Sequence, residues 1–304
     1  MTLQQLTYFI ATAEHGSFNA AARALFCSQP AVSDPVRKLE SELGVELFVR
    51  QGRGLALTSA GRTFLGHARA VVDTADEAAA SVGRGSFRRP ERVAMGTFRN
   101  APYYLVAELA ASFLEHNPQA RLRLPGHNSA AVAAAVRAGE LEAGLVGLPV
   151  EDRGLLVRPL FRDEVLFVSA DPARTADPVS IEAFVSGPLA LYDAGFGIED
   201  PTRRQVASRA QRAGLTLDPR FDVEHVETAL QLTAAGLAHT MAARSVTLDR
   251  AFPPTLHAVG FADPLYDTFA LVTRASGVVS SGTQRLLDLV DDWAADVRRH
   301  LQEH

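Results

Sequence analysis

The order of the first 57 residues constrains the fold of this chain more than any other feature. Three short stretches, residues 3–15, 18–26 and 28–44, space their apolar side chains three or four positions apart, which predicts three successive helices. Gly16-Ser17 and Cys27-Ser28 supply the turns between them, with each serine standing where a helix cap is expected. Three helices in so few residues predict a small, compact module.

A hairpin pattern follows the third stretch. Residues 45–58, VELFVRQGRGLALT, indicate two short strands joined by a turn at Gln51-Gly52-Arg53-Gly54. A tight turn between the second and third helices, followed by a basic hairpin, is typical of a winged helix-turn-helix. The alternative is a helical packing module with no nucleic-acid partner. Arg50 and Arg53 in the hairpin favour DNA binding over that alternative.

Residues 3–66 resemble the N-terminal domain of LysR-type transcriptional regulators nearly end to end. The most specific portions of the match are GSFNAAARAL, SQPAVSDPVRKLESELGVELF and LTSAGRTFL. The resemblance implies a ligand-responsive transcription factor whose winged helix-turn-helix, residues 1–58, binds double-stranded DNA.

In such a module the third helix enters the major groove, where its N-terminal side chains read base edges and basic residues contact phosphates. Gln29, Pro30 and Ser33 are therefore the expected readers. The full set of predicted DNA-binding residues is Ser28, Gln29, Pro30, Ser33, Asp34, Arg37, Lys38, Arg50 and Arg53.

Asp34 and Pro35 depart from the family pattern, in which the first position is commonly basic or polar and the second is commonly glutamine. Pro35 lacks the N–H that would bond the carbonyl of Ala31, at a cost of about 3 kcal/mol. This predicts a helix that is bent, or split with residues 28–33 as a separate turn. We expect the helix to survive because Val36, Leu39 and Leu43 anchor its later part in the core. Asp34 either accepts from a cytosine amino group or repels phosphate. We expect an altered operator preference and weaker non-specific DNA binding.

Residues 59–90 follow Thr58, a possible helix cap, and contain no proline before Pro90. Their apolar positions alternate in steps of four and three residues, as in a heptad seam. The seam consists of Phe64, Ala68, Val71, Ala75, Ala78 and Val82. This predicts a helix that pairs two chains, and the alternative is a helix packed on its own domain. The resemblance implies a homodimer through this linker helix and assembly into a homotetramer. Residues 83–91 predict a hinge.

From residue 91 onward, short apolar strands alternate with helices, which indicates parallel α/β sheets. Expected strands include residues 92–96, 121–125, 143–147, 165–169 and 267–273, and expected helices include 102–118, 129–139, 201–213, 227–234 and 280–303. Because the last strand and helix predict a return to the first lobe, we expect two lobes with a cleft and two crossings. Lobe I would hold about 91–163 and 266–304, and lobe II about 164–265.

Residues 91–304 resemble the family's effector-binding region, which is similar in fold to periplasmic solute-binding proteins, more by spacing than by identity. In α/β sheets, ligands bind beyond the carboxyl ends of strands, where helix N-termini present free N–H groups. By position, the resemblance implies that a small, often anionic effector binds at Thr97, Arg99, Asn100, Ser129, Thr202, Arg203 and Thr228. The alternatives are that Ser129 and Thr228 are only helix caps and that Arg99 is a surface charge.

Composition excludes several other classes of protein. The net charge of −5 divides into +2 for the first 90 residues and −7 for the rest, which suits a DNA-binding module joined to a different domain. A single cysteine, Cys27, excludes a disulfide within one chain and fits a reducing cytoplasm. The nine histidines lack metal-ligand spacing, and no phosphate-binding glycine motif or nucleophile motif occurs. We therefore expect no metal, no cofactor and no enzymatic activity.

No stretch of about 18 apolar residues and no secretory signal pattern occurs, so we expect no membrane partner. The sequence thus predicts an α/β fold with an N-terminal winged helix-turn-helix and a two-lobed effector region. Two other functions stay open for that region: a solute-binding protein of transport and a small-molecule enzyme. The winged helix argues against the first, and turnover of a cleft ligand would support the second.

Overall fold

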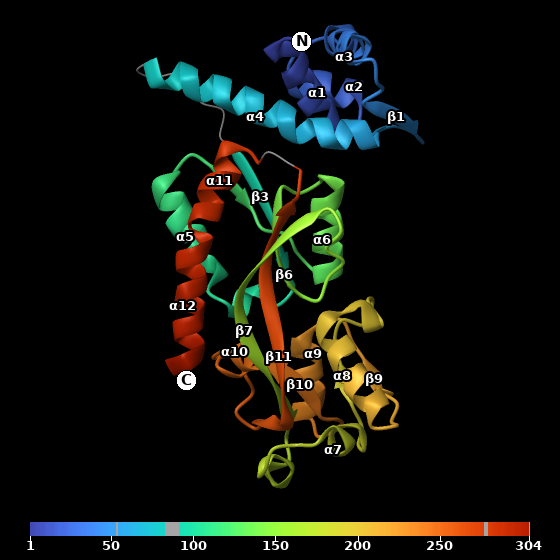
Figure 1. Ribbon diagram of the computed structural model, residues 1–304, viewed down its shortest axis with the longest axis vertical. Helices are drawn as coiled ribbons and strands as arrows, with labels where there is room; N and C mark the ends of the chain where they lie inside the picture. The colour runs from blue at the N-terminus through green and yellow to red at the C-terminus, as the bar shows by residue number, and fades with distance from the viewer. Residues whose placement is uncertain (53, 83–90, 277–278, 304) are drawn as a thin grey trace.

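The computed structural model describes residues 1–52, 54–82, 91–276 and 279–303. Figure 1 shows a small helical module at one end, a long helix beside it and an elongated α/β region below. The predicted DNA contact Arg53 and most of the predicted hinge, residues 83–91, lie outside the described residues.

The N-terminal module is a winged helix-turn-helix, as predicted. It comprises α1 (Leu3–His15), α2 (Phe18–Ala24), α3 (Gln29–Leu43), β1 (Phe48–Gln51) and β2 (Gly54–Leu57). The two strands pair antiparallel from Phe48 opposite Leu57 to Gln51 opposite Gly54. Leu6, Phe9 and Leu39 are buried in one core cluster that joins the helices to the hairpin. Burial of these side chains holds the three short helices together, since helices of this length are marginal alone.

Side chains at the helix ends fix the path of the chain. Ser17 caps α2, with its Oγ accepting from the N–H of Ala20 at 3.2 Å. Ser28 stands at the N-cap of α3, but its side chain makes no capping hydrogen bond. At the other end of α3, the Glu40 carboxylate accepts from the N–H of Leu47 at 2.8 Å, which ties the recognition helix to the hairpin.

Helix α3 runs without a break through Pro35, so the predicted separate turn at residues 28–33 does not form. Val36 and Leu39, directly after the proline, are both fully buried. Their packing compensates for the hydrogen bond that Pro35 cannot donate, which is why tertiary contacts override the local preference for a helix start.

The linker helix α4 spans Ser59–Val82 and packs against α1 in its first half. Thr58 Oγ1 accepts from the N–H of Gly61 at 2.9 Å, so the predicted cap is present. Of the predicted seam, Phe64 stacks against Phe9 at 5.3 Å between ring centroids, and Ala68 is buried in the same module. Val71 is 43% exposed. The beginning of the seam therefore packs within the chain's own N-terminal module, whereas Val71 further along the seam is exposed. The side chain of Val82, the last seam position, lies outside what the structure describes.

The regulatory region is built on a seven-stranded sheet in the order β10-β7-β11-β6-β3-β4, with β5 also paired to β3. Its strands are β3 (Arg92–Phe98), β4 (Arg121–Arg123), β5 (Gly126–His127), β6 (Ala143–Leu148), β7 (Leu155–Ser169), β10 (Thr240–Ala243) and β11 (His257–Arg274). Strand β3 is parallel to β4, β5 and β6, whereas β11 is antiparallel to β6 and β7, and β7 to β10. The sheet is therefore mixed rather than wholly parallel.

Two long antiparallel strands, β7 and β11, pass through both lobes and form the two predicted crossings (Figure 1). Lobe I contains α5 (Val106–His116), α6 (Ser129–Ala138), α11 (Ser281–Asp288) and α12 (Val290–Glu303). Lobe II contains α7 (Ile181–Val185), β8 (Ala190–Leu191), α8 (Pro201–Arg212), β9 (Phe221–Asp222), α9 (Val226–Ala234) and α10 (Arg244–Thr247). Helices α5 and α12 lie on one side of the lobe I sheet and α6 on the other.

Two predicted helices are each interrupted. Tyr104 and Leu105, the latter in the left-handed region with φ of 52°, separate a 3-10 turn at Ala101–Tyr103 from α5, so no single helix spans 102–118. Leu289 separates α11 from α12 within the predicted closing helix. In both cases apolar spacing continued across a change of direction, which periodicity alone does not detect.

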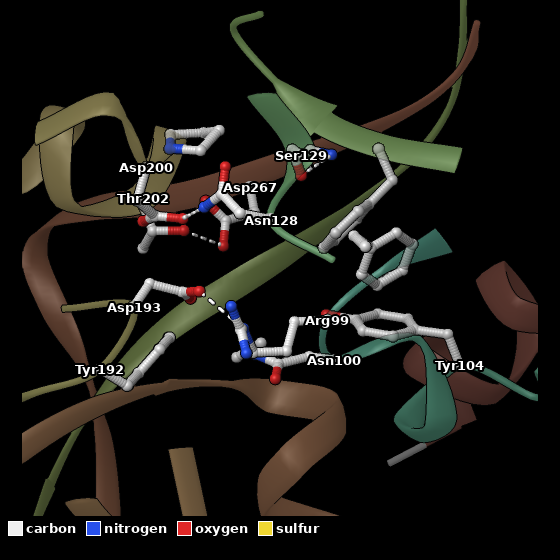
Figure 2. Close-up of a pocket in the computed structure, with 15 residues that line it drawn as sticks. Arg99, Asn100, Tyr104, Asn128, Ser129, Tyr192, Asp193, Asp200, Thr202 and Asp267 are labelled. Carbon is white, nitrogen blue, oxygen red and sulfur yellow. Dashed lines mark hydrogen bonds and ion pairs between the residues drawn. The ribbon is translucent and has the colours of Figure 1, made fainter. Parts of the chain in front are cut away.

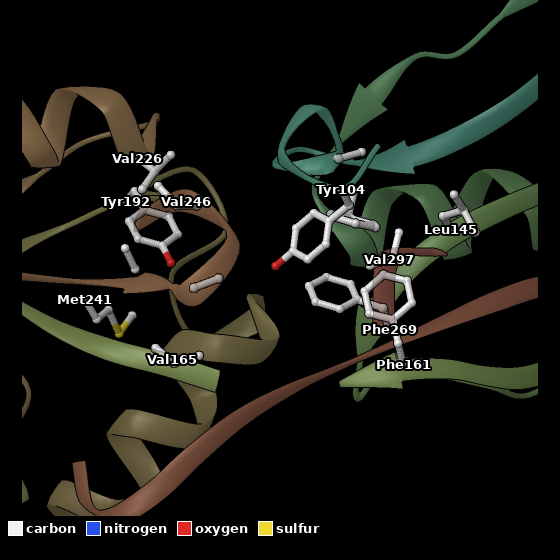
Figure 3. Packing of buried hydrophobic residues seen from close by; sticks show 14 of the residues in the cluster. Tyr104, Leu145, Phe161, Val165, Tyr192, Val226, Met241, Val246, Phe269 and Val297 are labelled. Atoms are coloured by element: carbon white, nitrogen blue, oxygen red, sulfur yellow. The ribbon is translucent and has the colours of Figure 1, made fainter. Parts of the chain in front are cut away.

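The buried side chains drawn in Figure 3 belong to one core cluster and lie in two groups, one in each lobe. Tyr104, Phe161 and Phe269 belong to the lobe I group, and Tyr192 and Met241 to the lobe II group. The hydroxyls of Tyr104 and Tyr192 point toward the space between the groups. The apolar core thus positions two tyrosines on facing walls.

Candidate functional site

The start of α3 presents an exposed polar face. Gln29, Pro30, Asp34, Arg37 and Lys38 all have exposed side chains, as does Ser28 just before the helix. Each of these residues is therefore accessible to a duplex.

One predicted reader is not on this face. Ser33 is only 3% exposed, and its hydroxyl donates to Asp34 Oδ1 at 3.2 Å. A side chain buried within its own module cannot reach a base edge, so the structure places Ser33 among the supporting residues.

The basic residues near this face are not neutralised within the chain. Arg37 and Lys38 on α3 and Arg50 on β1 are exposed, and none forms an ion pair with any described residue. Exposed, unpaired cations beside a recognition helix are suited to phosphate contacts. Asp34 places one negative charge among them.

A cleft lies between lobes I and II, with about 480 Å³ of empty space when its open mouth is counted. It is lined by Phe98, Arg99, Asn100, Tyr104, Asn128, Ser129, Gly147, Tyr192, Asp193, Asp200, Pro201, Thr202, Ala243, Asp267 and Phe269. We call this the effector cleft. Its walls come from the ends of β3 and β6, the start of α6 and α8, and the crossing strand β11.

Arg99, directly after β3, bridges the two lobes (Figure 2). Its Nε lies 2.9 Å from Asp193 Oδ1 and its Nη2 lies 2.6 Å from Glu224 Oε1. Asp193 adopts a positive φ of 61° and its side chain is 6% exposed. Burial raises the pKa of Asp193, and the Arg99 guanidinium opposes that rise. The arginine is therefore already engaged by two carboxylates of lobe II.

A second bridge joins the starts of two helices. Asn128 Nδ2 donates to Asp200 Oδ2 at 3.3 Å, while Asn128 Oδ1 caps α6 by accepting from the N–H of Ala130 at 2.9 Å. Asp200 Oδ1 caps α8 by accepting from the N–H of Arg203 at 2.9 Å. Burial, followed by repulsion from Asp193, raises the pKa of Asp200 to about 6.

Three carboxylates, those of Asp193, Asp200 and Asp267, line the cleft, and we call them the acidic wall. Asp267 contributes to this wall from β11. Its Oδ2 accepts from Thr202 Oγ1 at 2.8 Å and its Oδ1 accepts from Gln205 Nε2 at 3.1 Å. Burial raises the pKa of Asp267 to about 7, and Asp200 and Asp163 add to that rise. Both donors are neutral, so no cation offsets this carboxylate directly.

Four of the seven predicted effector residues line the cleft: Arg99, Asn100, Ser129 and Thr202. Ser129 does not cap α6, since Asn128 does; its Oγ accepts from the N–H of Gly147 at 2.8 Å.

The other three predicted residues do not line the cleft. Thr97 is 4% exposed and its hydroxyl is 3.4 Å from the Pro125 carbonyl, to which it donates. Arg203 turns away from the cleft, donating to the Tyr192 carbonyl and pairing with Asp222. Thr228 is exposed on α9.

Sequence reasoning missed the acidic and aromatic lining: Tyr104, Asn128, Tyr192, Asp193, Asp200 and Asp267. Asp200 before Pro201 and Asn128 before Ser129 were recognisable as helix caps. Asp267 and the tyrosines carried no local signal, because their meeting depends on how two distant segments cross.

The comparisons with known proteins agree with this architecture. Residues 88–295 match the LysR substrate binding domain, and residues 3–62 match the bacterial regulatory helix-turn-helix protein of the lysR family. The HTH-type transcriptional regulator TfdS of Cupriavidus pinatubonensis is 33% identical over 261 residues, covering 82% of this chain and 85% of the relative. The chain belongs to the LysR family of bacterial transcriptional regulators. Like them, it joins a DNA-binding helix-turn-helix to an effector-binding domain.

Other LysR-type relatives extend over nearly the whole chain. A probable hydrogen peroxide-inducible genes activator of Mycobacterium avium is 28% identical over 295 residues, covering 96% of this chain and 94% of the relative. A full-length OxyR variant from Pseudomonas aeruginosa superposes with a TM-score of 0.69 at 24% identity, over 97% of this chain and 94% of that chain. Full-length CbnR, solved in complex with its target DNA, superposes with a TM-score of 0.53 at 23% identity, over 97% of this chain and 100% of that chain. These likenesses show the shared fold.

Neither a metal site nor a membrane span is found in the described part of the molecule. No group of three His, Cys, Asp or Glu side chains there could hold a metal ion. No described helix is long and apolar enough to cross a bilayer. Cys27 lies in the turn between α2 and α3, far from the effector cleft in the sequence, and is partly buried.

Proposed function

We propose that this LysR-type regulator reads double-stranded DNA with the exposed start of α3 and the β1–β2 hairpin. Gln29 and Pro30 would face base edges, and Arg37, Lys38 and Arg50 would contact phosphates. The accessibility of these side chains and the absence of ion pairs to described residues support this assignment. Ser28 and Asp34 are exposed at the same end of the helix and belong to the proposed surface.

We propose that a small molecule binds in the effector cleft and changes how far the two lobes close. The observation that carries this proposal is that direct contacts join facing walls across the cleft. Arg99 of lobe I pairs with Asp193 and Glu224 of lobe II, and Asn128 donates to Asp200. A ligand between these groups must compete with the contacts or add to them, so it binds one degree of closure better than another.

The proposed division of labour is a DNA-binding domain at 1–58, a linker helix and hinge at 59–90 and an effector-binding domain at 91–304. Within the effector-binding domain, lobe I (residues 91–163 and 266–304) would move relative to lobe II (residues 164–265). We propose that α4 pairs with α4 of a second chain through the part of its seam that begins at the exposed Val71. This pairing would give a homodimer that assembles further into a homotetramer. Pairing through a long helix would set the spacing between two recognition helices.

We further propose that the chain is not an enzyme and that it acts in the cytoplasm, where its DNA is found. The hydrogen peroxide named for its Mycobacterium relatives is not proposed as its signal. A disulfide within one chain needs two cysteines, and this chain has Cys27 alone.

A gel-shift assay on the DNA upstream of the gene tests DNA reading. Specific retardation should weaken steeply between about 50 and 200 mM salt. Arg37→Ala should weaken binding to all sequences alike and reduce the salt dependence, whereas Gln29→Ala should relax the preference for the operator. Arg37→Lys, which keeps the charge, is the matched control. Retardation that is independent of both salt and sequence would contradict the proposal.

A further inference from the structure

The charges that line the effector cleft do not balance. Three carboxylates, those of Asp193, Asp200 and Asp267, face the cleft with a single guanidinium, that of Arg99. Arg99 is already shared by Asp193 and by Glu224 at the cleft edge. The lining is therefore acidic even after its one cation is counted.

The two remaining carboxylates accept hydrogen bonds only from neutral groups. Asp200 accepts from the Asn128 amide and a backbone N–H, and Asp267 accepts from Thr202 and Gln205. The nearby Arg203 guanidinium pairs with Asp222 instead. Behind this wall, Asp163 is 2% exposed. Its Oδ2 accepts from the Tyr104 hydroxyl at 2.8 Å and from the Ser245 N–H at 3.1 Å, whereas its Oδ1 accepts no hydrogen bond from any described residue. A buried carboxylate without a counter-charge either takes up a proton, as the raised pKa values of Asp200 and Asp267 indicate, or is joined by a cation.

Aromatic side chains form the other part of the lining. Phe98 and Phe269 lie 4.3 Å apart between ring centroids, and Tyr104 packs on both. Tyr192 faces them from lobe II, and both tyrosine hydroxyls point toward the intervening space (Figure 3). Burial raises the pKa of both tyrosines well above its ordinary value, so they stay neutral. Aromatic faces beside carboxylates attract an organic cation and exclude water from its apolar part.

Two of the groups that could hold an anion, Thr202 and Arg99, are committed elsewhere, whereas the Ser129 hydroxyl and the Asn100 side-chain amide donate to no described residue. The Thr202 hydroxyl donates to Asp267, and Arg99 is held by Asp193 and Glu224. A carboxylate ligand would have to break these contacts and approach Asp200 and Asp267 against their charge. The excess of carboxylates in the lining therefore favours a cation over the anionic effector that the family resemblance implies.

We propose that the effector cleft takes a small organic cation, a primary ammonium compound with a short apolar group, and that Asp200 and Asp267 hold its charge. The apolar group lies against the tyrosine and phenylalanine side chains, and the ammonium lies on the acidic wall. This assignment rests on the proposed effector role of the cleft and names the chemical class that the role requires.

Three isosteric probes test the charge requirement on the full-length protein: benzylamine, benzyl alcohol and benzoate. Thermal unfolding is followed at pH 8 with each probe up to about 10 mM. Two smaller amines, butylamine and methylamine, are tested in the same way. At least one of the three amines should raise Tm, while benzoate should not. A rise with benzoate alone, or no rise with any amine, would overturn the proposal.

Matched variants then locate the charge. Asp267→Asn and Asp200→Asn remove the charge and keep one of the two acceptor oxygens, which for Asp200 can still cap α8. Each should weaken binding of the effective amine about tenfold while leaving the affinity for the matching alcohol unchanged. Asp177→Asn, an exposed carboxylate in lobe II, is the control and should change neither. Equal amine affinity in all three variants would show that the ammonium binds elsewhere.

A gel shift with the same samples separates this inference from the proposed function. Specific DNA retardation that responds to benzoate but not to amines would sustain the regulator and overturn the cation assignment. If an amine binds in a manner that depends on Asp267 but the protein does not retard DNA, the cation assignment is sustained and the proposed regulator function is overturned.

Discussion

Phe26 lies in the turn between α2 and α3 with a positive φ of 54° and 97% of its surface exposed. The left-handed region costs a residue with a Cβ roughly 1–2 kcal/mol, and this side chain gains no burial in return. Phe26→Gly should therefore raise the free energy of unfolding by about 1 kcal/mol in urea titrations. Phe26→Ala keeps the Cβ and should show no comparable gain. Equal stability of the two variants would contradict a backbone origin.

The titration of Asp267 should make the free energy of unfolding depend on pH. Its pKa lies near 7 in the folded protein, because burial and the neighbouring Asp200 and Asp163 disfavour its charge. A folded pKa above the unfolded value contributes stability at low pH, and this contribution is lost as the pH rises through about 7.

The wild type should lose on the order of 2 kcal/mol more stability between pH 5 and pH 8 than Asp267→Asn. Urea unfolding of both proteins at the two pH values measures this difference. Titrating groups far from Asp267 cancel in the comparison, and the difference reports Asp267 together with the interacting Asp200 and Asp163. Parallel pH profiles would show that Asp267 keeps an ordinary pKa.

At the scale of the element, α3 shows how packing overrides a local signal. The proline, the acid before it and the serine before that resemble a helix start, yet α3 continues from Gln29 to Leu43. The residues that decide this are Val36 and Leu39, which are buried against α1 and the hairpin. Of the anchors expected from the sequence, Val36 and Leu39 are buried but Leu43 is 38% exposed. The competition between a missing hydrogen bond and buried area is settled only in three dimensions.

Pro35→Gln should restore the N–H that α3 lacks. The free energy of unfolding is expected to rise by roughly 1–3 kcal/mol, and the operator preference to change, because the base-reading end of the helix is reoriented. Urea unfolding and competition gel shifts measure the two effects. If both stability and sequence preference stayed the same, Pro35 would be without consequence in this helix. Pro30→Gln, in the first turn, is the control for stability because no hydrogen bond is lost there.

At the scale of the whole molecule, α4 divides its apolar seam between two tasks. Phe64 and Ala68 pack into the N-terminal core, whereas Val71 is exposed. If the exposed part joins two chains, Val71→Asp should shift sedimentation equilibrium toward monomer, because a charge at a seam position opposes pairing. Leu114→Asp changes a similarly exposed side chain on α5 and should leave assembly unchanged. A dimer insensitive to Val71→Asp would place the interface elsewhere.

The two lobes meet through residues that the sequence could not bring together. The N-terminal module and its three helices were predictable from periodicity and turn residues, and Arg99, Asn100, Ser129 and Thr202 were placed at the cleft by resemblance. Arg203 was assigned to the ligand, but its guanidinium is turned toward Asp222. Residue type and position in the chain gave no indication of that direction.

The amino-acid sequence by itself determined the family, the order of its modules and the loops that border the cleft, because these follow from local periodicity, capping and turn chemistry. The tertiary structure decided the charge of the cleft. Asp193, Asp200 and Asp267 come from three separate segments, and only the crossing of β7 and β11 brings them to one wall with Tyr104 and Tyr192. The charge of the effector cleft depends on the distances between these segments and on their burial, and neither quantity can be predicted from the local sequence.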